Sequence, residues 1–243
     1  MLILFDIDGT LYKGNGSGRA AFLRAGAAVF GEPFTDEGVA FSGRLDPLIF
    51  ADLIAANRRD HCNEKLAEAR ALSHAFLKEH HATREFNHSA CPGTIELVER
   101  LRSRNDLTLG VLTGNWPENG RIKLESVGFD PDWFPVSVWG MDGPTRNDLP
   151  PVACSRYLEM RGEPVAVERV LVVGDTIHDI ACAKVNGCRS LAVATGGGSW
   201  EELEAAAPDR LVPDLSETDD LIEWIDRMAT RGRGACAQAS ARF

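Results

Sequence analysis

Five short runs of mostly apolar residues are spread along the chain, and polar residues do not alternate with the apolar ones inside them. They are residues 2–5, 107–112, 136–139, 170–173 and 191–194. Nearly continuous apolar runs of this length are typical of parallel strands that are buried on both faces of a sheet. We therefore predict that these segments form strands of one parallel sheet.

Segments with helical spacing separate the later strands. In residues 93–104 the apolar positions are Ile95, Leu97, Val98 and Leu101. The other segments of this kind are residues 118–127, 149–160 and 180–186. Strands that alternate with helices predict an α/β fold with a doubly wound, Rossmann-like parallel sheet.

The stretch after the first strand has a different pattern. It contains no convincing strand, and helical patterns cover residues 20–30, 47–57 and 63–80. We predict an α-helical cap domain of residues 14–87, inserted into an α/β core of residues 1–13 and 88–229. Residues 230–243 are rich in glycine, alanine and arginine without an apolar period, which predicts a flexible tail.

Composition excludes several classes of partner. The chain has 243 residues, of which 44% are hydrophobic, and a formal net charge of −10. This charge disfavours nucleic acids and anionic membranes as partners, although local cations still permit an anionic substrate. The six cysteines form no CxxC pair, and we find neither a signal peptide nor an apolar stretch of about 20 residues. We expect a cytoplasmic protein with reduced thiols.

Polar residues with chemical potential follow three of the predicted strands. Asp6 and Asp8 come directly after the first strand. Alternate side chains of an extended segment point to the same side, so both carboxylates are expected to face one site. The other interpretation of this stretch is an ordinary turn between a strand and Gly9.

The ends of two later strands strengthen the interpretation of a site. Thr113, Gly114 and Asn115 follow one strand and offer donors for an anion, or simply the N-cap of a helix. Asp175 follows another strand, and Asp179 lies one helical turn further on. Ligands bind beyond the carboxyl ends of parallel strands, and hard oxygen ligands suit Mg²⁺.

Together, the segments FDIDGTL, LTGN and VGDTIHD resemble the motifs of the haloacid dehalogenase-like hydrolase superfamily. The helical insertion after the first motif is similar to the cap domain of that family. Within the predicted cap, FSGRLDPLI resembles relatives close to phosphoglycolate phosphatase and β-phosphoglucomutase. The resemblance covers most of the chain.

The resemblance implies a role for each motif residue. Asp6 matches the nucleophile that forms an aspartyl-phosphate, and Asp8 matches the general acid/base of the phosphatase branch. Thr113 matches the hydroxyl that holds a phosphate oxygen, helped by backbone amides near Gly114 and Asn115. Dehalogenases of the family lack the second aspartate, so Asp8 favours chemistry at phosphorus.

The resemblance also implies a Mg²⁺ site. Asp175 matches a direct ligand, and Asp179 matches a ligand or a carboxylate behind it. Asp6 would bind the ion through its carboxylate and Asp8 through its backbone carbonyl. The ion would neutralise repulsion between Asp6 and an anionic phosphate.

Two cations compete for the family's basic position beside the nucleophile. Arg146 lies in the segment TRNDLPP, at the usual place but without the common Lys-Pro pair, and we favour it. Lys123 lies on the helix after LTGN, where some relatives carry the cation. In the cap, Arg44 is the candidate for binding the far end of the substrate, either a carboxylate or a second phosphate.

The sequence therefore predicts a Mg²⁺-dependent phosphatase for a small-molecule phosphate ester, as a monomer or homodimer. The alternatives are a phosphomutase of the same superfamily and a non-catalytic protein that binds a phosphorylated metabolite. Gly196 to Gly198 follow the last predicted strand and predict a flexible loop, with the mouth of the site as the other interpretation.

Overall fold

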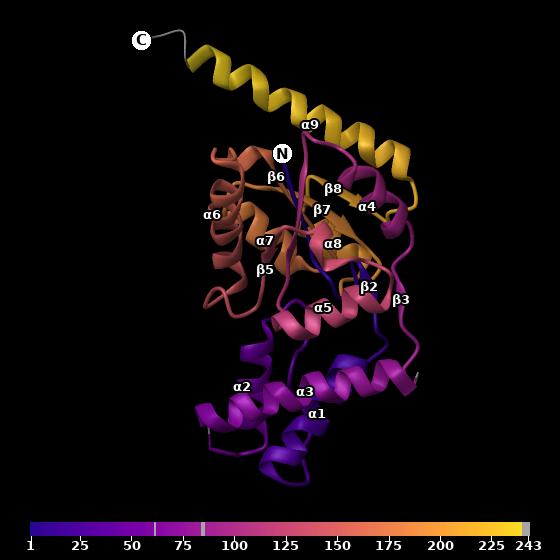
Figure 1. Cartoon of the computed structure of the whole chain (residues 1–243), viewed down its shortest axis with the longest axis vertical. Helices are drawn as coiled ribbons and strands as arrows, with labels where there is room; N and C mark the ends of the chain where they lie inside the picture. The colour runs from indigo at the N-terminus through magenta and orange to yellow at the C-terminus, as the bar shows by residue number, and fades with distance from the viewer. Residues whose placement is uncertain (61, 84–85, 240–243) are drawn as a thin grey trace.

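A computed structural model describes residues 1–60, 62–83 and 86–239, and side chains up to Ala229 (Figure 1). Its main element is a six-stranded sheet in the order β5-β4-β1-β6-β7-β8, in which all neighbouring strands are parallel. The strands are β1 Leu2–Phe5, β4 Thr108–Leu112, β5 Val136–Val138, β6 Val170–Gly174, β7 Arg189–Val193 and β8 Arg210–Val212. The predicted doubly wound α/β fold is confirmed, and β8 is a strand that the sequence analysis did not predict.

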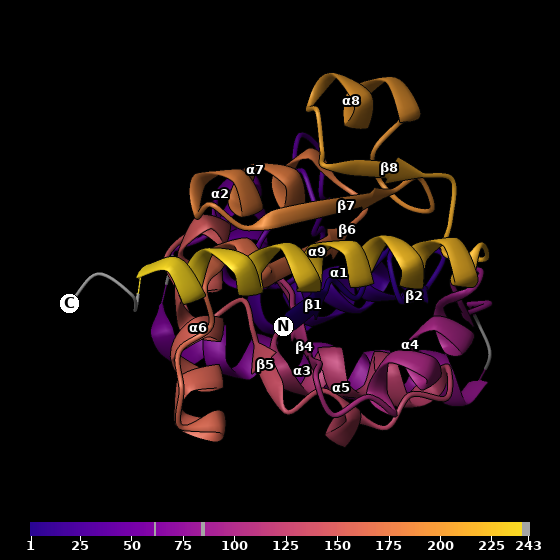
Figure 2. The same cartoon turned by 90° about the horizontal axis from the view of Figure 1, so that it is seen from above.

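The central strand β1 contributes side chains to two separate cores. Ile3 and Phe5 belong to the cluster that includes residues of α4, α5 and α9, whereas Leu2 and Leu4 belong to the cluster with α6 and α7. These helices lie on opposite faces of the sheet (Figure 2). Their bounds are α4 Thr94–Arg102, α5 Pro117–Ser126, α6 Leu149–Arg161, α7 Ile177–Val185 and α9 Thr218–Ala239. Burial on both faces explains why β1 is apolar throughout.

The register of β1 brings the polar strand ends together. Phe5 lies opposite Val111 of β4 and Val173 of β6. The residues after these three positions therefore leave the sheet at nearly the same level and at one edge. This edge carries all the strand-end residues that the sequence analysis selected.

Three helices form a cap beyond this edge, at the bottom of Figure 1. They are α1 Ser17–Phe30, α2 Asp46–Ala56 and α3 Asn63–Thr83. The cap has its own apolar cluster, which includes Phe22, Phe50 and Leu53, and Trp116 joins it from the start of α5. Two short antiparallel strands, β2 Tyr12–Lys13 and β3 Ser89–Ala90, pair where the chain leaves the core and returns to it. The cap boundaries at residues 14 and 87 stay a prediction and fall beside this pair.

The C-terminal part of the chain differs most from the prediction. Helix α8, Trp200–Ala205, and helix α9 were not predicted, and α9 continues to Ala239, where the sequence predicted a tail from residue 230. Alanine and arginine favour a helix, and a helix already nucleated upstream is cheap to extend. Residues 240–243 lie outside the described residues. Among the described residues, we find no helix that is both long and apolar enough to span a membrane.

Asp46, at the start of α2, links the cap to the core through two hydrogen bonds. Its Oδ2 accepts a hydrogen bond from the backbone N–H of Trp116 at 2.7 Å. Its own backbone N–H donates to the carbonyl oxygen of Gly114 at 2.7 Å. Burial raises the pKa of the Asp46 carboxyl to about 7, and the charge of Lys123 partly offsets this effect. The contact between cap and core therefore contains a carboxyl that is costly to ionise.

We expect Asp46→Asn to be more stable than the wild type at about pH 8, on the order of 2 kcal/mol, because the amide keeps an acceptor without the buried charge. The native carboxyl takes up a proton below about pH 7, whereas the unfolded chain keeps it ionised to about pH 3.8. The gain must therefore shrink as the pH falls from 7 to 4. Urea unfolding at a series of pH values measures it.

Asp46→Ala is the matched control, because it removes the charge and the acceptor together. It should be less stable than Asp46→Asn at every pH, since the N–H of Trp116 then lacks this partner. An Asp46→Asn variant that gains no stability at high pH would contradict the raised pKa.

Candidate active site

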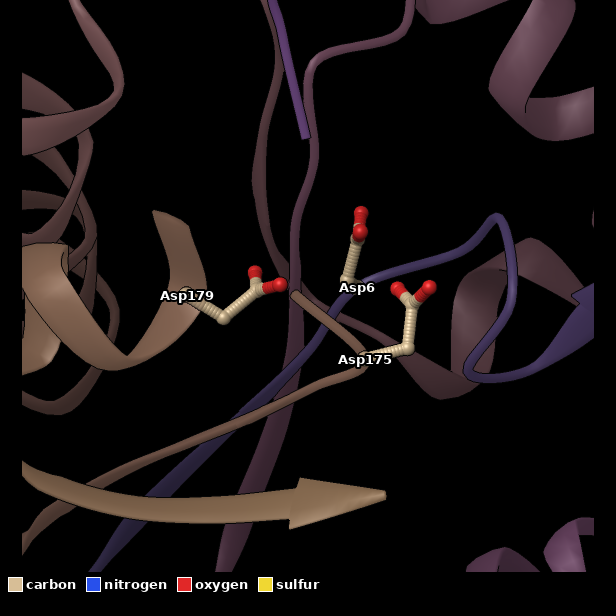
Figure 3. Close-up of side chains that lie close together, drawn as sticks. All are labelled: Asp6, Asp175 and Asp179. Carbon is tan, nitrogen blue, oxygen red and sulfur yellow. The ribbon is translucent and has the colours of Figure 1, made fainter. Parts of the chain in front are cut away.

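Three buried aspartates meet at the carboxyl edge of the sheet (Figure 3). Asp6 follows β1, Asp175 follows β6, and Asp179 lies in the first turn of α7. One carboxylate oxygen from each lies within 4.8 Å of the others. The sequence predicted these residues as metal ligands, and the fold brings their side chains together.

Local structure fixes the direction of Asp179. Thr176 is the N-cap of α7, and its N–H and hydroxyl donate to Asp179 Oδ2 at 3.0 and 2.7 Å. This capping box uses one carboxylate oxygen to satisfy the start of the helix. The other oxygen, Oδ1, is left to contact Arg146.

Burial and mutual repulsion disfavour the ionised forms of Asp6 and Asp175. Burial raises the pKa of Asp6 to about 6, where the charge of Arg146 opposes the shift and those of Asp179 and Asp8 add to it. Burial also raises the pKa of Asp175 well above its usual range, and Asp179 and Asp6 add to that effect. A set of hard oxygen donors that resist ionisation without a counter-charge fits a divalent cation such as Mg²⁺.

Arg146 is the cation that contacts the aspartate cluster. It lies in the short helix η2, Arg146–Asp148, and its Nη2 is 3.1 Å from Asp6 Oδ2 and also donates to Asp179 Oδ1. Its Nη1 donates to the carbonyl oxygen of Gly43 in the cap at 3.4 Å. The side chain is 7% exposed, so its charge acts on these carboxylates with little screening by water.

Lys123 has a different partner. Its Nζ lies 2.9 and 2.7 Å from the two carboxylate oxygens of Asp8 and 2.5 Å from Asn115 Oδ1. Asn115 Nδ2 in turn donates to Asp8 Oδ2 at 2.7 Å and to the hydroxyl of Thr113 at 2.8 Å. The two candidate cations thus do not compete for one position: Arg146 contacts Asp6, and Lys123 contacts Asp8.

Asp8 itself lies outside the cluster of three carboxylates, as far as the described side chains show. Its side chain is 50% exposed and is held by Lys123 and Asn115. A ligand role for its backbone carbonyl stays a prediction. In this arrangement Asp6 is buried while Asp8 reaches the open space between core and cap.

The backbone of the LTGN segment touches the cap directly. A Cβ atom added at Gly114 would lie 2.0 Å from the carbonyl oxygen of Arg44, so only glycine permits this approach. The Arg44 guanidinium forms an ion pair with Asp52 of α2, with Nη1 2.5 Å from the carboxylate. Arg44 therefore lies at the site with its charge already matched by a cap carboxylate.

A cleft of about 430 Å³ lies between the core and the cap. Every site residue predicted from the sequence lines it except Asp179, which lies behind Arg146. The lining members of that set are Asp6, Asp8, Arg44, Thr113, Gly114, Asn115, Lys123, Arg146 and Asp175. A volume of this size is typical of sites for small molecules.

Two glycines beside Asp175 were not assigned to the site from the sequence. The backbone N–H of Gly197 donates to Asp175 Oδ2. A Cβ atom at Gly196 would lie 2.0 Å from that same oxygen and 2.6 Å from the Cα of Gly9. The predicted flexible loop therefore packs tightly against a carboxylate. The glycine run after a strand was the available signal, but it does not distinguish a packed loop from a mobile one.

Comparison with known proteins gives matches along most of the chain. A model of the haloacid dehalogenase-like hydrolase family matches residues 3–184, and a HAD-hydrolase-like model matches residues 151–218. The chain is 27% identical to a 5'-nucleotidase of Pseudomonas aeruginosa over 221 residues, which cover 91% of this chain and 95% of that protein. It is 30% identical to a phosphoglycolate phosphatase of Synechococcus elongatus over 138 residues, 56% of this chain and 59% of that protein.

The fold is also similar to that of a solved structure, CbbY from Rhodobacter sphaeroides in complex with phosphate. The TM-score is 0.70 at 22% identity, and the match covers 89% of this chain and 95% of that chain. At this identity the likeness concerns the fold. It supports the description of a Rossmann-like core with a helical cap.

We expect Arg146→Met to lower the free energy of unfolding by roughly 3–5 kcal/mol in buffer with a metal chelator, because it leaves buried carboxylates without their cation. Urea unfolding monitored by tryptophan fluorescence measures the loss. Arg189→Met is the control, since the pair of Arg189 and Asp209 is largely exposed and should change stability by about 1 kcal/mol or less. Equal losses in the two variants would show that Arg146 does not stabilise the cluster.

Proposed function

Since the chain belongs to the haloacid dehalogenase-like hydrolase family, we propose that it is a Mg²⁺-dependent phosphatase that hydrolyses a small phosphorylated metabolite through an aspartyl-phosphate intermediate. One observation carries this proposal. The cleft presents a buried carboxylate, Asp6, beside Arg146, and an exposed carboxylate, Asp8, beside Lys123. The first pair suits attack on the phosphorus of an anionic phosphate group. The second pair suits proton transfer to the oxygen of the leaving alcohol.

The reaction has two steps. A carboxylate oxygen of Asp6 forms a bond to phosphorus, the ester bond breaks, and protonated Asp8 gives its proton to the leaving alcohol. In the second step Asp8 accepts a proton from a water molecule that attacks the same phosphorus and releases Asp6. The Thr113 hydroxyl and the backbone amides of Gly114 and Asn115 hold the phosphate oxygens.

The residues that would hold Mg²⁺ are Asp6, Asp175 and Asp179, with the backbone carbonyl of Asp8. When bound, the ion offsets the negative charge that Asp6 and the phosphate bring together. Three buried carboxylates within 4.8 Å of one another, with the pKa values of Asp6 and Asp175 raised by burial, support this assignment.

Arg146 and Lys123 receive separate roles in this proposal. Arg146, which contacts Asp6, takes the family's basic position beside the nucleophile and binds a phosphate oxygen. Lys123 and Asn115 orient the Asp8 carboxylate toward the leaving group. Arg44 keeps its predicted role at the far end of the substrate, where an anionic group of the ligand would compete with Asp52 for the guanidinium.

The named relatives support phosphate ester chemistry. They include a 5'-nucleotidase and a phosphoglycolate phosphatase, and a structure of similar fold contains phosphate. For this chain the proposed partner is a small-molecule phosphate ester. The proposed location is the cytoplasm, which the six cysteines without a CxxC pair support.

We expect the protein to release phosphate from a panel of small phosphate esters when Mg²⁺ is present and to stop when a chelator is added. Asp6→Asn removes the nucleophile and should lower the rate by a factor of about 10⁴ or more. A malachite green assay of inorganic phosphate measures both effects.

Each alternative gives a different result in the same assay. Isomerised phosphate esters without free phosphate would indicate a phosphomutase. Binding of esters by a folded protein without any turnover would indicate a non-catalytic protein. Release that persists in Asp6→Asn would contradict the role of Asp6.

With p-nitrophenyl phosphate as the substrate, we expect Asp8→Asn to release about one p-nitrophenolate per protein in a rapid burst, followed by slow turnover. The nitrophenolate leaves without a proton, so the first step survives, whereas the attacking water lacks its base in the second step. With an alkyl phosphate both steps should slow. Stopped-flow absorbance measures the burst, and Asp6→Asn, which should show none, is the control. An Asp8→Asn variant with wild-type rates on alkyl phosphates would exclude Asp8 as the acid.

A further inference from the structure

Asn119, on α5, has a carboxamide oxygen that lacks a hydrogen-bond partner within the described part of the chain. The residue is 2% exposed, and it lines the cleft between core and cap. Buried polar atoms in native proteins nearly always have a partner. Because Asn119 borders a binding cleft, a ligand in that cleft can supply the missing partner.

The hydrogen-bond network fixes which atom of the Asn119 amide is unpaired. Asn119 Nδ2 lies 3.4 Å from the hydroxyl oxygen of Ser73 on α3. The single hydroxyl proton of Ser73 is donated to the carbonyl oxygen of Arg70 at 2.8 Å. With its proton directed there, Ser73 accepts from Asn119, so in this network the NH₂ group faces Ser73 and the oxygen stays free.

Asn119 also has a defined place relative to the proposed chemistry. Lys123, which holds Asp8, lies one helical turn further along α5, so the two side chains share a face of the helix. On the cap side, Gly18 at the start of α1 is close to Lys123: a Cβ atom there would lie 3.6 Å from Nζ. This part of the cleft is thus next to the acid/base, where the leaving group of a substrate would lie.

We infer that Asn119 is a specificity-determining residue whose carboxamide oxygen accepts a hydrogen bond from a neutral hydroxyl group of the leaving alcohol. The inference rests on the proposed phosphatase function and names its substrate class: phosphorylated polyols or sugars. The cleft of about 430 Å³ has room for a phosphate and a chain of several hydroxylated carbons.

Other functional groups fit this position poorly. A carboxylate has only acceptors, so it would leave the Asn119 oxygen unpaired and repel it. An ammonium group would meet the positive charge of Lys123 one turn away. The two arginines that line the cap side, Arg19 and Arg44, form ion pairs with Asp36 and Asp52. A carboxylate-bearing leaving group would have to break one of these pairs.

Binding to Asp6→Asn protein in Mg²⁺ tests the inference without turnover. Isothermal titration compares two matched pairs of ligands, sn-glycerol 3-phosphate against propyl phosphate and ribitol 5-phosphate against pentyl phosphate. Each pair has one carbon chain with and without hydroxyls. We expect at least one hydroxylated ligand to bind roughly 10-fold or more tightly than its deoxygenated partner. We also expect 2-phosphoglycolate to bind more weakly than that hydroxylated ligand.

Two further substitutions in this background separate recognition from structure. Asn119→Leu keeps the size of the side chain but removes the acceptor. It should bring the ratio of the two dissociation constants within a ligand pair to about 2 or less. Ser73→Ala breaks the same contact between α3 and α5 but leaves the Asn119 oxygen, so it should keep the ratio within about twofold of its value in the Asp6→Asn protein. A ratio lost equally in Ser73→Ala would show that Asn119 only positions the cap, and this overturns the inference.

The remaining outcomes distinguish this inference from the proposed function. Tight binding of 2-phosphoglycolate with no preference for hydroxyls overturns the inference, even if the wild-type protein hydrolyses phosphate esters. A hydroxyl preference that disappears in Asn119→Leu supports the inference, even if the wild-type protein releases no phosphate and the proposed function fails.

Discussion

The site depends on one constraint, the repulsion between carboxylates that the fold places together away from water. Asp6, Asp175 and Asp179 share the edge of the sheet because β1 and β6 end at the same level. In an interior of low dielectric such charges cannot all ionise without a cation. Arg146 supplies one positive charge against three carboxylates, and the pKa values of Asp6 and Asp175 are still raised, mainly by burial and further by their carboxylate neighbours. A divalent cation would offset this remaining negative charge.

The need to match charges extends from the core into the cap. Arg146 donates to the carbonyl of Gly43, so the group that neutralises the cluster also holds a cap loop over it. A few residues along this loop, Asp46 bonds to the backbone at Gly114 and Trp116. The contacts that join the cap to the core therefore include the residue that offsets the charge of the cluster. In the proposed mechanism such contacts would keep water away from the reacting phosphate, which strengthens each charge interaction in the cleft.

Much of the architecture and of the site could be predicted from the sequence, because strand burial and strand-end chemistry are local signals. β1 is apolar throughout and ends in Asp6, and this pattern alone placed a carboxylate at the edge of a covered sheet. β8 escaped prediction because its three residues, Arg210–Val212, are only half-buried and include an arginine. In helix α9 only the C-terminal part lacks an apolar period: Leu221, Ile225 and Ala229 recur at every fourth position and are buried, a helical signal that the sequence analysis did not use.

The parts of the site that could not be predicted depend on contacts across long sequence distances. Nothing local shows that Lys123 reaches Asp8, 115 residues earlier, while Arg146 reaches Asp6. The sequence analysis expected Asp6 and Asp8 to face one site, and both residues line the cleft. It did not show that the side chain of Asp8 contacts Lys123 and Asn115 and not the aspartate cluster.

This separation of the two aspartates accounts for the different partners of Arg146 and Lys123. In the proposed mechanism Asp6 is the nucleophile and must stay ionised beside an anionic phosphate, so it needs a positive charge that is buried with it, as Arg146 is. Asp8 is the proposed acid/base and must exchange protons with an alcohol and with water, which suits its place at the open side of the cleft beside Lys123 and Asn115. A single cation between Asp6 and Asp8 would bind both carboxylates in one network. With separate partners each proposed catalytic carboxylate has its own cation, and only the longer-range charge of Asp8 still acts on Asp6.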